Sequence, residues 1–386
     1  MLNLAPLLAI ACFYFAYFAF NGLFSPYWGL YLASLSFPAW QIGILTSLTQ
    51  VNRIYAPTLW GWLADRRGSR QGILRIAGIA GLIFFIPLLF VHAFWPLFFT
   101  VLIASFFWSA SLPLVEATAM TLLSGDGGAY ARLRIWGSVG FIVATVIAGY
   151  LMQHQGVATF PWAVVAVMVS LALFSWQVPE ASVAQKNISI SEKLMDVLKK
   201  SEVQVLLLSC FLMALAHGPY YSFYSIYAAE YGHDKSTIGW FWTIGVMAEV
   251  GAFWLMPKLT RRFSLKNLFL FGLAMAVLRF MAIAWGMGSL ALLVLAQLAH
   301  AFTFGSHHAV TMAYIHRYFT GSNQTRGQAL YIAASFGLGG SLGGILAGLL
   351  WVPLGGQWVF SLAALIAAAA WFLARRGLNS TPTIQA

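Results

Sequence analysis

Residues 6–33 spell PLLAIACFYFAYFAFNGLFSPYWGLYLA, a run of 28 residues that contains no Asp, Glu, Lys or Arg. A hydrocarbon layer about 30 Å thick is crossed by roughly 20 apolar residues in an α-helix. The run is therefore long enough to span a membrane. It is also too long for the apolar region of a secretory signal, and no small-residue cleavage site follows it.

The rest of the chain has the same character. Of its 386 residues, 61% are hydrophobic and 8% are charged, whereas soluble domains carry about 25% charged residues. A soluble globule is excluded because its uncharged surface would aggregate in water. The net charge of +11 does not indicate nucleic-acid binding, because the basic residues lie in short runs between apolar segments. Cys12 and Cys210 lie inside apolar runs, so we expect them to be small core residues, with no disulfide framework and no metal site. No cofactor is expected.

Apolar runs of similar length recur along the chain and predict an all-α membrane protein with twelve transmembrane helices. An even number of spans places both termini on one side of the membrane. The predicted spans are 6–33, 39–63, 73–92, 95–122, 133–153, 158–177, 204–229, 236–257, 265–287, 290–316, 326–351 and 355–374.

Basic residues predict which side this is. Eighteen of the 21 Lys and Arg residues lie in the loops after even-numbered spans, at the first few residues of the spans that follow these loops, or in the C-terminal tail. Lys235 is in an opposite loop, and Arg53 and Arg279 lie inside predicted helices. Because cytoplasmic loops are enriched in Lys and Arg, we expect both termini in the cytoplasm of a bacterial cell, with the chain in its inner membrane.

The longest polar connection divides the chain into two halves. It covers residues 178–203, and its second half predicts a short amphipathic helix. Residues 1–177 and 204–386 then form two six-helix bundles, each with a basic loop after its second helix. This layout is typical of the parallel repeats of secondary transporters.

One of these loops resembles a known signature. The stretch Gly61-Trp-Leu-Ala-Asp65-Arg66-Arg67-Gly68-Ser69-Arg70 is similar to the Gly-x-x-x-Asp-Arg-x-Gly-x-Arg loop of the major facilitator superfamily. Asp65 can pair with arginines and bond helix N-terminal amides, and the glycines permit close approach and a tight turn. We therefore expect a cytoplasmic gate; anchoring to lipid head groups is the alternative. Its predicted residues are Gly61, Asp65, Arg66, Gly68, Arg70 and Arg134.

A narrower resemblance covers several segments. Tyr130-Ala-Arg-Leu-Arg134-Ile-Trp136-Gly-Ser-Val, Ala216-His217-Gly-Pro-Tyr220-Tyr221, Val246-Met-Ala-Glu249-Val and the region of Arg279 resemble the phenylpropionate permease family, relatives of the lactose permease. The resemblance implies a major facilitator fold and transport of a small solute.

Ionisable residues inside membrane helices usually face the protein interior and carry function. Glu116, Glu249, Arg279 and His300 are the predicted proton-coupling residues. With Arg134, they occupy the helices in which the lactose-permease resemblance implies such groups. No glutamate follows the histidines of the tenth span, so Glu249 is the expected proton carrier. A structural Glu249–Arg279 ion pair, structural histidines and a Glu116–Arg134 helix contact are the alternatives.

Polar and aromatic stripes at helical spacing predict a cavity at the membrane midplane. Ordinary helix packing is the alternative for the tyrosines. The predicted substrate-binding residues are Arg53, Tyr17, Asn21, His217, Tyr220, Tyr221, Tyr224, Trp242, His307 and His308.

We expect a proton-coupled symporter of a small aromatic carboxylate such as phenylpropionate, because protonating Glu249 would leave an excess positive charge for a substrate anion. A sugar or nucleoside symporter and a drug exporter of the same fold are alternatives. An integral-membrane enzyme is disfavoured, since no nucleophile–base pair or two-histidine metal spacing is visible. Its expected partners are a small-molecule substrate, protons and the lipid bilayer, with no nucleic acid, and a monomer is expected.

Overall fold

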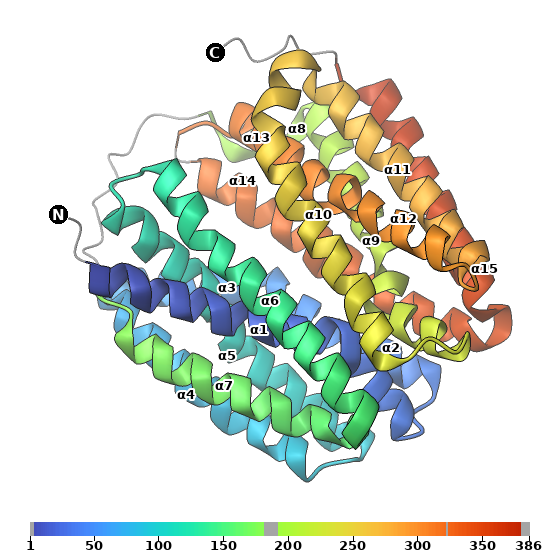
Figure 1. Cartoon of the computed structure of the whole chain (residues 1–386). Coiled ribbons are helices and arrows are strands. Elements are labelled where there is room, and N and C mark those ends of the chain that lie inside the picture. The colour runs from blue at the N-terminus through green and yellow to red at the C-terminus, as the bar shows by residue number, and fades with distance from the viewer. Residues whose placement is uncertain (1–3, 181–191, 322, 380–386) are drawn as a thin grey trace. The chain divides into compact units, whose positions relative to one another are not determined.

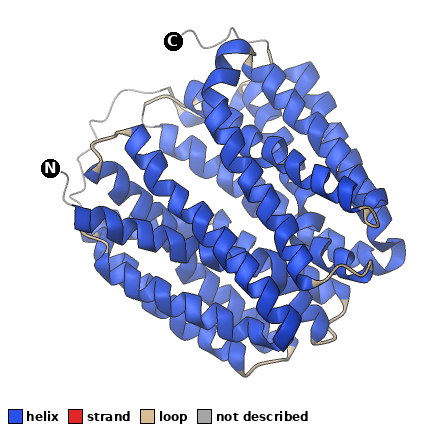
Figure 2. Cartoon of the chain, in the orientation of Figure 1, coloured by secondary structure: helices blue, strands red, loops and turns tan. Residues whose placement is uncertain are grey.

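The structure is a computed structural model that describes residues 4–180, 192–321 and 323–379. Within these residues the chain is helical and contains no strand (Figure 2), so the predicted fold class is confirmed. Ten segments of the described chain are long and apolar enough to cross a membrane, which makes it a multi-pass membrane protein. One of the ten, residues 323–377, contains two of the predicted spans.

The chain divides into two compact units. The first consists of the described residues of Met1–Lys186 together with His233–Thr243, and the second of the described residues of Asn187–Gly232 together with Ile244–Ala386. Residues 181–191 of the predicted linker lie outside the described residues. Its described part contains the short helix α8 (Leu194–Lys199).

The first unit is built from long helices connected by short turns (Figure 1). α1 packs along α6 and α7, and α4 packs along α5 and α7. The elements are α1 (Leu4–Ser34), α2 (Ala39–Val51), η1 (Asn52–Ile54), α3 (Ala56–Arg67), α4 (Arg70–Phe85), η2 (Ile86–Leu89), α5 (Phe94–Leu122), α6 (Gly127–Gln155), η3 (Val157–Thr159) and α7 (Phe160–Gln177).

The predicted span 39–63 is not one continuous helix. It breaks at the 3₁₀ turn η1, and Tyr55 leaves the helical conformation with φ −131°. Pro57 follows within the first turn of α3, and proline lacks the N–H that would continue a helix. Arg53 therefore lies in the break rather than in the middle of a regular helix.

The second unit contains α8, α9 (Ser201–Glu230), α11 (Leu265–Gly286), α12 (Leu290–His300), η4 (Ala301–Ser306), α13 (His307–Tyr318), α14 (Asn323–Ile332), η5 (Ala333–Gly339) and α15 (Gly340–Gly377). α10 (Lys235–Arg262) contributes its first nine residues to the first unit and the rest to the second. α15 packs along α9 and α11.

Two irregularities shape this unit. η4 and η5 are π-helical turns, a form that is rare and is often found at functional sites. α15 is kinked at Gly355, whose φ of 79° and ψ of 158° interrupt the helix between the two predicted spans 326–351 and 355–374. The kink turns one long helix into two.

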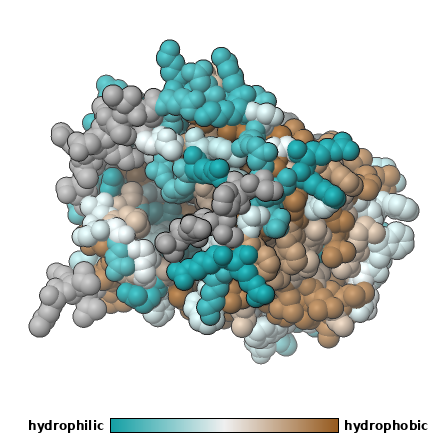
Figure 3. Space-filling model, turned by 90° about the horizontal axis from the view of Figure 1, so that it is seen from above, coloured by the Kyte–Doolittle hydropathy of each residue, from teal (hydrophilic) through white to brown (hydrophobic). Residues whose placement is uncertain are grey.

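The surface has the character of a membrane protein. Large hydrophobic side chains are exposed along the helices, among them Phe90, Trp254 and Val352. The space-filling view shows hydrophilic side chains gathered in its upper and middle part and hydrophobic ones over its right part (Figure 3). Exposed apolar flanks are unfavourable in water and favourable in lipid.

Candidate substrate and proton site

Glu249 and His300 form a close pair in the second unit. Glu249 Oε1 lies 2.6 Å from His300 Nε2, and the side chains are only 15% and 6% exposed. His300 is the last residue of α12, directly before the π-helical turn η4. At this distance the two atoms share one proton, either as N–H to carboxylate or as carboxyl O–H to the ring nitrogen. The pair can therefore hold or release a proton.

Arg279 lies in the same unit and is 1% exposed. Its Nε donates to the carbonyl oxygen of Ala296 at 3.0 Å, and its Nη1 donates to His217 Nε2 and Thr303 Oγ1, both at 3.3 Å. Its guanidinium lies 4.1 Å from the ring centroid of Tyr220. Every one of these partners is neutral, provided that His217 carries no charge.

The hydrogen bonds of His217 support its neutral form. Its Nδ1 lies 2.8 Å from the carbonyl oxygen of Met213, which can only accept, so Nδ1 carries a hydrogen. Its Nε2 faces Arg279 Nη1, which can only donate, so Nε2 must be unprotonated. His217 therefore acts as an acceptor that holds Arg279 in place.

Among the described residues, Arg279 makes no ion pair. The alternative of a structural Glu249–Arg279 ion pair is therefore wrong for this structure. The reason is geometric, since His300 lies at 2.6 Å from the carboxylate and His217 and Thr303 accept from the guanidinium.

Gln297 and Thr303 belong to this cluster but were not predicted. Tyr220 OH donates to Gln297 Oε1 at 2.9 Å, and Gln297 is fully buried. Gln297 precedes His300 by three residues on the same helix, which places both side chains on one face. The sequence could have indicated Gln297, because an amide side chain three residues before His300 is unusual in an apolar helix.

A second polar cluster lies in the first unit. Arg134 Nε lies 3.6 Å from Glu116 Oε1, and these side chains are 32% and 36% exposed. Tyr130 OH donates to the same carboxylate oxygen at 3.3 Å, and the Arg134 guanidinium lies 4.0 Å from the ring centroid of Phe18. The structure thus forms the contact expected as the alternative for Glu116, joining α5 to α6.

Comparison with known proteins identifies the family of this chain. Residues 7–362 match the family described as MFS_1 like. An Escherichia coli protein named as a probable 3-phenylpropionic acid transporter is 31% identical in sequence to this chain, over 94% of this chain and 96% of its own length. The chain belongs to the major facilitator superfamily. Its relatives are transporters, so it is a transporter and not an enzyme.

Other relatives of the transporter differ in their substrates. The maltose permease of Geobacillus stearothermophilus is 25% identical over 85% of this chain and 83% of its own. A crystal structure of the nucleoside transporter NupG aligns with a TM-score of 0.83, at 20% identity, over 96% of this chain and 98% of that one. A bacterial homologue of the lysosomal transporter Spinster aligns with a TM-score of 0.73 over 97% of each chain, at 15% identity. The structural likeness supports the fold.

Tyr17, a predicted substrate residue of the first unit, lies beside the Glu116 cluster, because its ring is 5.1 Å from that of Phe18, on which Arg134 packs. Tyr17 stacks on Trp108 with ring centroids 4.6 Å apart and an interplanar angle of 5°. Asn21 donates to the backbone oxygen of Tyr17 at 3.1 Å, so its amide is engaged within α1. Arg53 is half-buried in η1.

The remaining predicted substrate residues of the transporter lie in different surroundings. Tyr224 is buried against Tyr220, whereas Tyr221 is half-buried. Trp242 is buried on the part of α10 that belongs to the first unit. His307 packs on Phe269 with centroids 4.6 Å apart, and His308 lies 3.1 Å from Tyr331 Oη. The structure therefore places His217 and Tyr220 in contact with Arg279, whereas His307 contacts Phe269 and His308 contacts Tyr331.

Among the residues predicted to form the cytoplasmic gate, Asp65 does not lie at the centre of a bonded cluster in the described chain. Asp65 and Arg66 are exposed, and no ion pair of Asp65 is present in the described chain. Gly68 ends α3 in the left-handed conformation, with φ 66°. Gly61 leaves open space where a β-carbon would lie, so close approach does not require a glycine there.

Glu180, which was not predicted, bonds the helix N-terminus instead. Its Oε1 accepts from the Arg70 N–H at 3.0 Å, and its Oε2 accepts from Ser69 Oγ at 2.6 Å and the Gln71 N–H at 3.2 Å. Arg70 also donates from Nη1 to Thr121 Oγ1 at 3.4 Å. A carboxylate at the start of α4 is favoured by the helix dipole.

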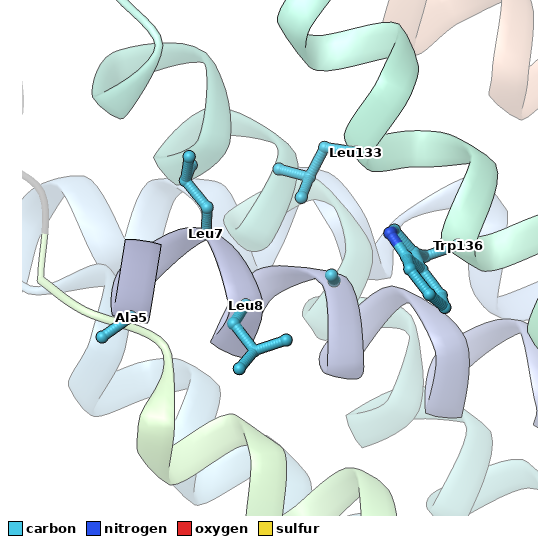
Figure 4. Close-up of a pocket in the computed structure, with 6 residues that line it drawn as sticks. Ala5, Leu7, Leu8, Leu133 and Trp136 are labelled. Atoms are coloured by element: carbon cyan, nitrogen blue, oxygen red, sulfur yellow. The ribbon is translucent and has the colours of Figure 1, made fainter. Parts of the chain in front are cut away.

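A pocket of about 320 Å³ lies elsewhere in the first unit, between α1 and α6 (Figure 4). It contains none of the predicted proton or substrate residues, and its lining is apolar. Leu8 and Trp136 are more than 45% exposed, so this pocket opens on the flank of the helices. Its lining consists of Ala5, Leu7, Leu8, Ala11, Leu133 and Trp136.

Proposed function

We propose that this transporter is a proton symporter of a small aromatic carboxylate, with Glu249 and His300 as the proton-carrying pair and Arg279 as the substrate's counter-charge. The observation that carries the proposal is the 2.6 Å contact between Glu249 Oε1 and His300 Nε2 in a nearly buried site. The relative described as a probable 3-phenylpropionic acid transporter supports the substrate class.

The charge on the pair supports proton coupling. With Glu249 ionised and His300 a neutral imidazole that donates its Nε2–H to the carboxylate, the pair has a net charge of −1 and offsets the +1 charge of Arg279. A second proton makes the pair neutral and leaves Arg279 as an uncompensated buried cation. Since uncompensated buried charge is costly, an incoming carboxylate is favoured at that moment. Proton and anion would then move together.

Uptake by purified protein in proteoliposomes tests this proposal. With an imposed pH gradient, the wild type should accumulate labelled 3-phenylpropionate. Glu249→Gln should lose proton-driven accumulation while keeping exchange of internal for external substrate. Glu230→Gln is the matched control, because Glu230 is exposed at the end of α9. Proton-driven accumulation by Glu249→Gln at the wild-type level would refute the proton role.

A nucleoside or sugar symporter is the second candidate. Its support comes from the relatives named as nucleoside permease NupG and maltose permease, and stacked rings such as Tyr17 on Trp108 suit neutral ring-containing solutes. In the same liposomes, saturable uptake of uridine or maltose without uptake of 3-phenylpropionate would favour this candidate over the carboxylate.

We also propose on which side of the membrane the termini lie and in which membrane the protein resides. The distribution of Lys and Arg favours cytoplasmic termini in a bacterial inner membrane, and the protein is proposed to act as a monomer. Reporter fusions at each terminus test the orientation: alkaline phosphatase, which is active outside the cytoplasm, should be inactive at both ends.

A further inference from the structure

The end of α10 carries positive charge that the described chain does not neutralise. Nine Lys and Arg residues follow Glu249 in the sequence, and no Asp or Glu does. Three of the nine, Lys258, Arg261 and Arg262, lie in the last two turns of α10 and are exposed. None of the three forms an ion pair with a described residue. Their counter-charge therefore comes from outside the described chain.

The acidic residues of the linker and of the first turn of α9 are bonded elsewhere. Glu192 Oε2 lies 2.7 Å from Lys200 Nζ, and Asp196 Oδ1 lies 3.9 Å from Lys199 Nζ. Glu202 Oε2 accepts from a tyrosine hydroxyl at 2.6 Å. Each of these carboxylates thus has a nearer partner than the end of α10.

One face of α10 is apolar first and basic at its end. Met247, Val250 and Trp254 are exposed, and Trp254 is 76% exposed. Lys258 and Arg261 follow at the same helical spacing, so the five side chains share one face over about 21 Å. Such a face complements a molecule that has a long apolar chain and an anionic head group.

The ring of Trp254 lies beside the charge on this face. Lys258 Nζ is 5.4 Å from the Trp254 ring centroid. Tryptophan is enriched where membrane helices reach the head groups, and lysine stems run along apolar surface with the charge in the polar layer. Other helix ends have the same pairing at a spacing of four residues: Trp62 with Arg66 on α3, and Trp371 with Arg375 on α15. The attraction of cations to a helix C-terminus accounts for the basic residues but not for the exposed ring before them.

We propose that this face of α10 binds an anionic phospholipid of the bilayer, with its phosphate between Lys258 and Arg261 and an acyl chain along the apolar residues before them. Each basic residue near an anionic lipid surface strengthens the attraction about fivefold. Zwitterionic lipids carry a compensating cation beside their phosphate, so an anionic head group is preferred. Glu249 lies about 140° around the helix from Trp254, so the lipid face is distinct from the proton-carrying pair.

Fluorescence quenching at one position of α10 tests this site. A bimane label is attached to Val250→Cys in a background of Cys12→Ser and Cys210→Ser, and the protein is reconstituted in vesicles of dioleoylphosphatidylcholine. Quenching by phosphatidylglycerol with brominated acyl chains is compared with quenching by phosphatidylcholine with the same chains. We expect the affinity for phosphatidylglycerol to exceed that for phosphatidylcholine at least about tenfold. At Leu365→Cys, an exposed position in the middle of a helix, the ratio should be near one. Equal ratios at the two positions would overturn the site.

Charge variants identify the residues that hold the phosphate. Lys258→Gln and Arg261→Gln should each lower the affinity ratio about fivefold. Lys258→Arg keeps the charge and should leave the ratio within about twofold. Lys235→Gln is the matched control, because it removes a positive charge from the other end of the same helix. A ratio that falls equally in Lys235→Gln and Lys258→Gln, or in neither, would refute the proposed contacts.

Two further measurements test the ring and the nature of the ligand. Trp254→Leu should lower the ratio about two- to fivefold, because the cation–π contact with Lys258 is lost. Trp240→Leu, at an exposed position near the start of α10, should not change it, and an equal fall in both variants would refute the role of the ring. Inorganic phosphate should quench and displace no more than chloride at the same ionic strength. Displacement of phosphatidylglycerol by phosphate alone would show a site for free anions and overturn the lipid as its ligand. No transported substrate is present in these measurements, so their outcome is independent of the proposed function.

Discussion

His217→Leu separates two roles for the buried histidine. The sequence pattern predicts that His217 contacts substrate, whereas in the structure its Nε2 accepts from Arg279 Nη1 and its Nδ1 donates to the Met213 carbonyl. Leucine fills a similar volume and removes the acceptor. Thr303 Oγ1 remains as the other acceptor of Nη1, so one hydrogen bond to the guanidinium is lost.

A hydrogen bond to a charged group contributes about 1.5–3 kcal/mol. Only part of this free energy affects substrate binding, namely the part needed to hold the Arg279 guanidinium in its binding position. For His217→Leu we therefore expect a loss of roughly 1.4 kcal/mol, or about tenfold weaker affinity for 3-phenylpropionate. His217→Gln supplies a carbonyl acceptor at a similar distance and should keep the affinity within about threefold, on the order of 0.6 kcal/mol.

Calorimetric titration of the purified protein with 3-phenylpropionate measures these affinities. Thr303→Val should weaken binding in the same way, and Thr311→Val is its matched control, because Thr311 bonds the His307 carbonyl and not Arg279. If His217→Gln binds as weakly as His217→Leu, the histidine touches the substrate itself, and the positioning role is refuted.

Three further changes test individual contacts through thermal unfolding in detergent. Glu180→Ala should lower the midpoint more than Asp65→Ala, because Glu180 bonds the start of α4 and the described residues give Asp65 no such contact. Gly355→Ala should destabilise the protein by about 1–3 kcal/mol, since its φ of 79° and ψ of 158° suit glycine alone. Asp126 accepts from the backbone N–H groups of Ala129 and Gly128, which lower its pKa, so its contribution is present above the ordinary pKa and is lost as the pH falls through the lowered value. The midpoint of Asp126→Asn should accordingly respond less to acid than that of the wild type.

The sequence alone predicted the spans because a membrane imposes length and hydrophobicity on each helix. The break before Pro57 was missed, because residues 39–63 were treated as one span, although the residue before a proline is biased away from the helical conformation. The π-helical turns η4 and η5 carry no such signal. They arise where packing between helices inserts an extra residue into a turn, and one-dimensional patterns do not contain that packing.

The sequence predicted several residues of the candidate site but not which of them contact one another. Glu249, Arg279 and His300 stood out because charged and polar groups are rare in apolar helices. Which of them touch depends on the rotation of α10, α11 and α12 about their axes, and a rotation of one residue is 100°. The pairing of Glu249 with His300, and of Arg279 with His217, therefore required three-dimensional structure. Glu180 was missed because it lies outside every predicted span.

The neutral surroundings of Arg279 imply an order of binding. If a carboxylate of the protein bonded the guanidinium, substrate would have to displace it; here the acceptors are His217, Thr303 and the Ala296 carbonyl. The opposing charge resides on the Glu249–His300 pair, so its protonation decides whether the site attracts an anion. Affinity for 3-phenylpropionate should fall as the pH rises in the wild type, because fewer pairs then carry the second proton. In Glu249→Gln, which cannot be ionised at this position, affinity should be nearly independent of pH over the same range. Equal pH dependence in both proteins would mean that the proton is carried elsewhere.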